Sequence, residues 1–174
     1  MPVEVKGGLA LRKALKKFAP DLAKETQKEI ASFLKPVVTQ ARGFIPSQAP
    51  LSGWGKASAT GRFPEWSSSA AKRGIGYKTT PSKPNRRGFR SLARLFNKTA
   101  AGAIYETAGR KTPDSRFVQN LNSKYASSMK GQAKMEGRVL YRAYEEDQGK
   151  AQNGVLKAIE KAKIKLNQRA TVVG

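Results

Sequence analysis

The first quarter of the chain carries two amphipathic helical patterns in succession. Apolar residues at helical spacing begin at Leu9 and end at Phe18. A new helix can then start at Pro20, because proline is tolerated in the first turn of a helix. The apolar positions of the second pattern recur at intervals of three and four residues: Leu22, Thr26, Ile30, Phe33, Leu34, Val37 and Ala41. We expect a long helix over residues 21–42, kinked near Pro36, whose apolar stripe is core or a contact with another subunit.

Residues 44–70 have no regular period and are rich in glycine, proline, serine and alanine. A long irregular loop inside a compact domain usually serves a purpose. This one holds both tryptophans of the protein, Trp54 and Trp66. Their rings either insert between subunits, as tryptophan does at interface hot spots, or fold back onto their own domain. The sequence leaves both alternatives open.

Two short strands are indicated on either side of a basic segment. Apolar residues alternate within residues 71–80, and residues 91–97 fit a second strand, so the two could form a hairpin. Between them, proline and glycine at high density predict an exposed, irregular basic arm over residues 81–90. Its candidate contact residues are Lys83, Arg86, Arg87 and Arg90. A further short edge strand is expected at residues 3–5.

The last third of the chain contains a small-residue run, a polar connector and a helical end. Residues 100–110 are mostly small, which permits close approach of backbones within a sheet or across a subunit contact. Residues 111–135 are polar and indicate a linker with transient or partner-dependent structure. A nearly continuous helix is then expected from Glu136 onward. It should bend or break near Gly149 and Gly154, since each glycine weakens a helix by about 1 kcal/mol relative to alanine.

Length and composition favour one domain, residues 1–174, that does not catalyse a reaction. The chain has no cysteine and no histidine, which removes thiol nucleophiles, thiolate metal sites and the usual general base. A carboxylate pair is the remaining route to catalysis. The adjacent acids at residues 145–147 point in different directions on a helix and are expected to be solvated. We therefore expect no enzyme activity, no metal and no cofactor.

The charge points to an acidic partner. Lysine and arginine number 34 and aspartate and glutamate 12, which gives a net charge of +22. Residues 67–116 carry 12 basic and 2 acidic side chains and are the most basic third. A flexible basic arm attracts any polyanion, so its target is either an acidic protein surface or nucleic-acid phosphates. No stretch approaches the roughly 20 apolar residues that span a bilayer, so we expect a soluble protein made inside a cell, with no membrane partner.

Several segments of the chain resemble the neck and tail-completion proteins of long-tailed bacteriophages. The most specific are residues 103–106 (Ala-Ile-Tyr-Glu) with 108–110 (Ala-Gly-Arg), and Gly137-Arg138 with Arg142-Ala143. The resemblance implies an α+β fold, in which long N- and C-terminal helices pack on a small antiparallel sheet with long irregular loops. It also implies a non-enzymatic virion subunit that is made in the host cytoplasm.

Such subunits form a ring at the head–tail junction, between the capsid portal and the tail tube. The expected partners are copies of the chain in a hexameric or dodecameric ring, neighbouring connector, closure or tail-terminator proteins, and DNA passing through the lumen. The candidate interface residues are Trp54, Trp66, Tyr105, Leu34 and Ile159. A basic nucleic-acid-binding protein that contacts phosphates non-specifically is the alternative.

Overall fold

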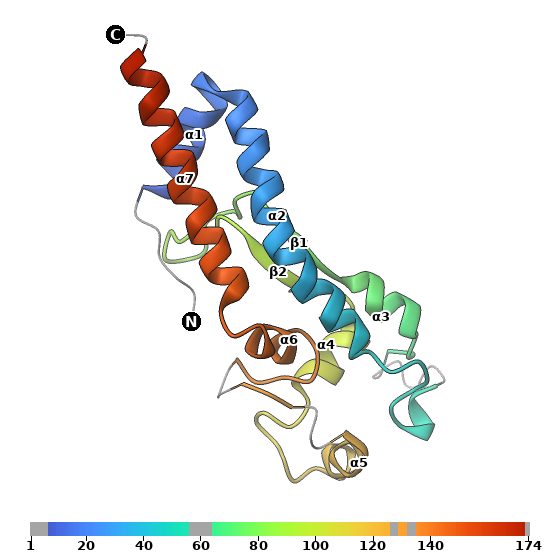
Figure 1. Ribbon diagram of the computed structural model, residues 1–174. Helices are drawn as coiled ribbons and strands as arrows, with labels where there is room; N and C mark the ends of the chain where they lie inside the picture. Colours follow the sequence, from blue (N-terminus) through green and yellow to red (C-terminus); the bar gives the residue numbers. More distant parts are fainter. Residues whose placement is uncertain (1–6, 56–63, 126–128, 132–134, 173–174) are drawn as a thin grey trace. The chain divides into compact units, whose positions relative to one another are not determined.

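The computed structural model describes residues 7–55, 64–125, 129–131 and 135–172. Over those residues it is mainly helical with one two-stranded antiparallel sheet, and the predicted α+β class is confirmed (Figure 1). The chain divides into two compact units. Unit 1 combines residues 1–35, 77–94 and 150–174, and unit 2 combines residues 36–76 and 95–149.

Unit 1 is built around three helices. It contains α1 (Gly8–Phe18), the part of α2 (Pro20–Gly43) up to residue 35, and α7 (Lys150–Val172). In Figure 1, α7 lies beside this part of α2. The buried residues at the centre are Leu15, Ala19, Leu22, Ala23 and Ala162, with Leu11 and Leu166 packed against them. The two predicted N-terminal helices are confirmed, and α2 continues through Pro36.

The predicted break in the C-terminal helical region is confirmed at Gly149. Helix α6 (Leu140–Glu146) ends just before Gln148 and Gly149, whose φ angles of 53° and 77° lie in the left-handed region. Glycine adopts that conformation without the steric cost that a Cβ imposes. Gly154 instead lies inside α7, where a Cβ would collide with the ring of Phe33. This second glycine is therefore a point of close contact with α2.

Unit 2 gathers the shorter helices around a chain of aromatic rings. Its elements beyond α2 are the 3₁₀ turn η1 (Ser52–Trp54), α3 (Ser68–Gly74), α4 (Ala100–Thr107), α5 (Arg116–Tyr125) and α6. The centroid of the Trp54 ring lies 5.1 Å from that of Trp66 and 5.5 Å from that of Phe117. Tyr105 lies 5.6 Å from Trp66 and 5.8 Å from Tyr125, again between ring centroids. Tilted and edge-on ring contacts of this kind stabilise a core beyond the area that they bury.

Residues 111–135 were predicted to be a polar linker with transient or partner-dependent structure, and part of that range is instead the packed helix α5. Val118 and Leu121 are buried on one face of this helix. The hydroxyl of Ser115 accepts a hydrogen bond from the N–H of Val118, which supports the first turn. The small-residue run at 100–110 is likewise helical, as α4, and the first residues of the predicted strand at 71–80 belong to α3.

The predicted hairpin is confirmed with shorter strands. Strand β1 (Ile75–Lys78) pairs with β2 (Arg94–Asn97) in the two-stranded sheet. Glycine at residue 76 leaves room for the Phe96 ring, which a Cβ would approach to 2.8 Å. The strand expected at residues 3–5 lies outside the described residues.

Candidate functional site

The connection between β1 and β2 is an ordered turn. The side-chain oxygen of Asn85 accepts hydrogen bonds from the N–H groups of Arg87 and Phe89, each at 2.9 Å. The N–H of Asn85 donates to the Phe89 carbonyl and that of Gly88 to the Asn85 carbonyl, both at 2.9 Å. Gly88 supplies the left-handed conformation that the turn needs, with φ of 76°. We call residues 81–91 the hairpin tip; the sequence predicted an irregular arm here, and asparagine was the signal for a defined turn.

The base of the hairpin tip is also fixed. The N–H of Ser82 donates to the carbonyl of Ser91 at 2.9 Å, and the N–H of Ser91 donates to the Ser82 hydroxyl at 3.0 Å. Beyond this pair, every residue from Lys83 to Arg90 is exposed. The four predicted basic contact residues therefore lie together on one exposed turn.

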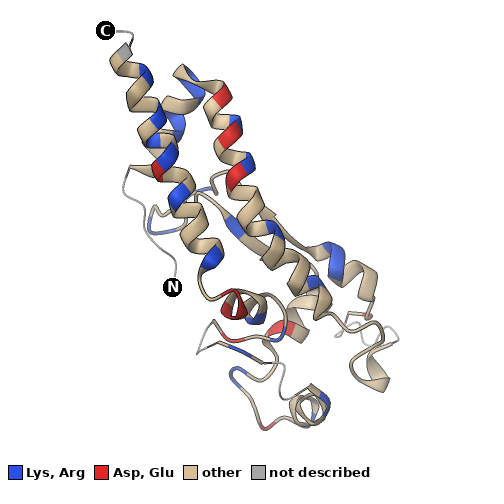
Figure 2. Cartoon of the chain, in the orientation of Figure 1, with Lys and Arg blue, Asp and Glu red and all other residues tan. Residues whose placement is uncertain are grey.

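No acidic residue lies near these cations in the sequence. From residue 66 to residue 105 the chain contains nine lysines and arginines and no aspartate or glutamate. Among the described residues, no ion pair involves Lys83, Arg86, Arg87 or Arg90. Figure 2 shows acidic positions on α2 and α6 and only basic positions on the hairpin. The positive charge of the hairpin tip is therefore not neutralised within the described chain.

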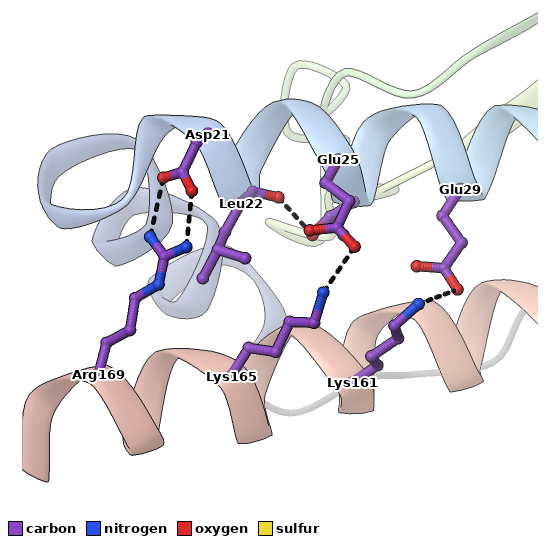
Figure 3. A network of polar contacts seen from close by, with 8 residues as sticks. Asp21, Leu22, Glu25, Glu29, Lys161, Lys165 and Arg169 are labelled. Carbon is purple, nitrogen blue, oxygen red and sulfur yellow. Dashed lines mark hydrogen bonds and ion pairs between the residues drawn. The ribbon is translucent and has the colours of Figure 1, made fainter.

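The acidic side chains of α2 pair instead with α7, in a ladder that the sequence analysis missed (Figure 3). Asp21 accepts two hydrogen bonds from Arg169, at 2.9 and 2.7 Å. One and two turns further along α2, Glu25 pairs with Lys165 at 2.6 Å and Glu29 with Lys161 at 3.2 Å. The three acids and the three bases each recur every four residues, which is the signal that predicts two antiparallel helices with matched faces.

These pairs shift the titration of the acids. The hydrogen bonds from Arg169 lower the pKa of Asp21 to about 2. The hydrogen bond from Lys165 lowers the pKa of Glu25 below its usual value. All of these groups remain accessible to water, so the ladder aligns the helices more than it stabilises them.

A buried polar cluster in unit 2 joins the segments on which the family resemblance rests. Glu106, on α4, is 3% exposed, and its two carboxylate oxygens accept hydrogen bonds from the N–H groups of Leu140 and Tyr141 at 2.8 and 2.9 Å. These N–H groups belong to the first turn of α6, and that turn contains no acidic residue. Burial raises the pKa of Glu106, and the backbone hydrogen bonds oppose that rise. A Cβ on Gly137 would collide with this carboxylate, so a larger residue there would displace Glu106 from its present position.

Arg138 is the second charged member of this cluster and has no exposed surface. Its guanidinium donates to the carbonyls of Ala108 at 2.6 Å and Tyr105 at 3.3 Å, and to the side-chain oxygen of Asn122. The N–H groups of this guanidinium thus connect α4 to α5. Burial lowers the pKa of the guanidinium. Both charged groups are buried, and their hydrogen bonds hold α4, α5 and the start of α6 together.

The predicted interface residues lie mostly inside the chain. Leu34 is 6% exposed, Trp54 3%, Trp66 7% and Tyr105 1%. Of the two alternatives for the tryptophans, the structure shows the second: the rings fold back, and the Trp54 indole N–H donates to the carbonyl of Pro64 at 2.9 Å. The expectation that these four residues face a neighbouring subunit is therefore corrected. Ile159 is half-buried beside a small apolar cavity of about 30 Å³.

The acids at residues 145–147 do not form a metal-binding group. Glu146 pairs with Arg142 at 2.8 Å and accepts a hydrogen bond from Gln40 at 2.8 Å. Over the described ranges there is no cluster of three metal-ligating side chains and no helix long and apolar enough to cross a membrane. Comparison with known proteins finds no matching family model, no matching curated protein and no matching solved structure.

Proposed function

We propose that this chain is a structural subunit of the head–tail junction of a long-tailed bacteriophage, within a neck or tail-completion ring that joins the capsid portal to the tail of the virion. The observation that carries the proposal is the buried cluster around Glu106 and Arg138. The segments with the most specific resemblance, residues 103–106 with 108–110 and Gly137-Arg138 with Arg142-Ala143, supply both charged groups of the cluster and the two backbone carbonyls that accept hydrogen bonds from Arg138. The resemblance therefore involves residues that hold unit 2 together rather than scattered surface positions.

In this proposal the chain functions by assembling with other subunits and does not catalyse a reaction. Long N- and C-terminal helices pack on the small antiparallel sheet, and long irregular loops reach copies of the chain or adjoining connector, closure or tail-terminator proteins. Apolar surface for such contacts must come from residues that the chain leaves exposed. Phe18 on α1 and Ile164 on α7 are 70% and 50% exposed, which makes them better interface candidates than the tryptophans.

The test is the mass of the assembled protein. Native mass spectrometry and sedimentation over a concentration series, at 150 and 500 mM NaCl, should detect multiples of the 19.0 kDa chain that persist in high salt. Contacts between apolar residues are not screened by salt. Phe18→Asp and Ile164→Asp should reduce assembly, and Gln168→Asp, at an exposed polar position on α7, is the control. A monomer at every concentration, inert toward portal-side and tail-side proteins, would contradict the proposal.

Leu34→Asp is not a useful assembly variant. The Leu34 side chain is 6% exposed, so a carboxylate there would be buried without a partner and the chain would lose stability. Loss of assembly in that variant would report unfolding rather than a lost contact. Variants at exposed positions avoid this ambiguity.

A second candidate function, nucleic-acid binding through phosphates, is favoured by the absence of acids over residues 66–105. Contacts between basic side chains and phosphates release counterions, so affinity falls steeply as salt rises. Binding of the full chain to duplex DNA, measured at several NaCl concentrations, tests this function. A salt-independent affinity would exclude it.

A further inference from the structure

We propose that the hairpin tip, residues 81–91, enters the major groove of duplex DNA as a two-stranded ribbon and holds the duplex independently of its sequence. The inference rests on the second candidate function, nucleic-acid binding, and does not depend on ring assembly. It assigns the contact to one element, and it names the form of nucleic acid that this element fits.

The shape of the hairpin tip is the first argument. The major groove of B-form DNA is about 12 Å wide and admits a two-stranded ribbon. The Ser82–Ser91 pair holds the two arms of the hairpin together at the base of the turn. Asn85 then closes the turn with two side-chain hydrogen bonds. An exposed segment held in one conformation loses little conformational entropy on binding.

The charge of the hairpin tip is the second argument. Three of its four cations are arginines, whose guanidinium groups match phosphate geometry, and all four are exposed without an ion pair among the described residues. By contrast, Lys161, Lys165 and Arg169 on α7 are paired with the acids of α2. The hairpin tip therefore gathers four exposed cations on one turn, and none of them forms an ion pair among the described residues.

The composition of the hairpin tip argues against other polyanions. Stable protein interfaces are organised around apolar and aromatic anchors, and the hairpin tip offers a single large apolar side chain, Phe89, which is 41% exposed. Single-stranded nucleic acid is held by successive stacking aromatics, and one ring does not make such a platform. A charged, narrow ribbon with little apolar surface fits a duplex groove lined by phosphates on both sides.

The first experiment measures binding of the full chain to a 30-base-pair duplex by fluorescence anisotropy between 50 and 200 mM NaCl. Replacing Arg86, Arg87 and Arg90 with alanine removes three phosphate contacts, so the slope of log affinity against log salt should become shallower by about 2.7. Over that salt range the unaltered chain should lose about fortyfold more affinity than the variant. The matched control replaces Lys13, Lys16 and Lys24, three exposed lysines of α1 and α2, and lowers the net charge equally.

The outcomes distinguish failure of the hairpin-tip inference from failure of nucleic-acid binding itself. If the unaltered chain does not bind the duplex even at 50 mM NaCl, both nucleic-acid binding and the inference fail. If it binds and the two triple variants have the same salt slope, the inference is overturned while nucleic-acid binding stands. A far shallower slope in the hairpin variant alone, with an unchanged circular dichroism spectrum, supports the inference.

The second experiment tests the groove and the class of partner. Duplex RNA of the same length should bind at least several-fold more weakly, because the deep, narrow major groove of A-form RNA excludes a ribbon. Asn85→Ala, which removes no charge, should also weaken DNA binding several-fold by loosening the turn. Equal affinity for RNA, displacement by the minor-groove ligand netropsin, or competition by poly-glutamate as effective per charge as that by DNA would each overturn the assignment.

Discussion

The carboxylate of Glu106 does the work that a capping residue does at most helix starts. The first N–H groups of a helix have no partner within it, and a side chain next to them in the sequence usually accepts their hydrogen bonds. In α6 the acceptor comes from α4, 34 residues earlier in the chain. One carboxylate thereby fixes the position of two helices. Its burial is costly, as the raised pKa shows, and the two backbone hydrogen bonds offset that cost.

Removing this carboxylate should destabilise the chain through the unsatisfied N–H groups of Leu140 and Tyr141. We expect Glu106→Ala to lower the free energy of unfolding by about 2–3 kcal/mol, measured by urea denaturation at pH 7. Glu106→Gln should recover part of the loss, since its amide oxygen can still accept one of the two hydrogen bonds. Glu145→Gln, at an exposed carboxylate of α6, is the control. Equal stability of the alanine variant and the unaltered chain would show that the cap is dispensable.

The α2–α7 ladder links two helices whose sequences lie more than 100 residues apart. On α2 alone, Glu25 and Glu29 are like charges one turn apart, which suggests weak repulsion. Their partners on α7 turn that repulsion into a set of matched pairs. A charge pattern on one helix can thus be interpreted only together with the face that it meets.

The lowered pKa of Asp21 predicts a loss of stability in acid. In the unfolded chain this carboxyl titrates near 4, and in the folded chain near 2. Its stabilising contribution is therefore complete above pH 4 and is lost as the pH falls toward 2. Thermal unfolding at pH 2, 3, 4 and 6 should show a smaller fall in Tm below pH 4 for Asp21→Asn than for the unaltered chain. Asp114→Asn, whose side chain is exposed, should follow the unaltered chain.

The contact between Gly154 and the Phe33 ring gives a prediction opposite to helix propensity. Alanine favours an isolated helix by about 1 kcal/mol over glycine. In α7, however, the added Cβ would collide with the ring carbons of Phe33. We expect Gly154→Ala to lower the free energy of unfolding by about 1–3 kcal/mol. Asn153→Ala, at the exposed neighbouring position, should be neutral or stabilising. A neutral or stabilising effect of Gly154→Ala would contradict the close contact between Gly154 and the Phe33 ring.

The elements that the sequence predicted well are those with a long, regular pattern. Helix α2 was expected over residues 21–42 and spans Pro20–Gly43, because its apolar stripe repeats without interruption from Leu22 to Ala41. Helix α5 was missed because it is short and its four apolar positions, Phe117, Val118, Leu121 and Tyr125, stand among polar neighbours. The hairpin was found from alternation and turn residues, which are local signals.

The buried cluster could not be predicted because its contacts are not local. Arg138 reaches acceptors about 30 residues earlier in the chain, and its sequence neighbours do not indicate burial. Likewise, tryptophan is common both in subunit interfaces and in cores, so the sequence around Trp54 and Trp66 does not decide between the two locations. Only their neighbours in the fold, such as Phe117, distinguish the two.

The net charge of +22 on 174 residues affects the whole chain rather than any one contact. Like charges repel one another in the folded state and are farther apart in the unfolded chain, so excess charge destabilises compact structure. The ion pairs of α2 with α7 act in the opposite direction, but exposed pairs contribute little. Salt screens both effects, and the larger one decides the result.

We expect the repulsion to be the larger effect, so Tm should rise as NaCl increases from 20 to 300 mM. At the higher concentration the screening length falls below 10 Å, so repulsion between cations farther apart than this is largely screened. The Arg86, Arg87 and Arg90 to alanine variant has a net charge of +19 and should show a higher Tm than the unaltered chain at 20 mM NaCl and a smaller rise with salt. A Tm that falls with salt would mean that the α2–α7 pairs outweigh the repulsion. The positive charge of the hairpin tip would then not destabilise the fold, and binding of a polyanion would not stabilise the fold by neutralising that charge.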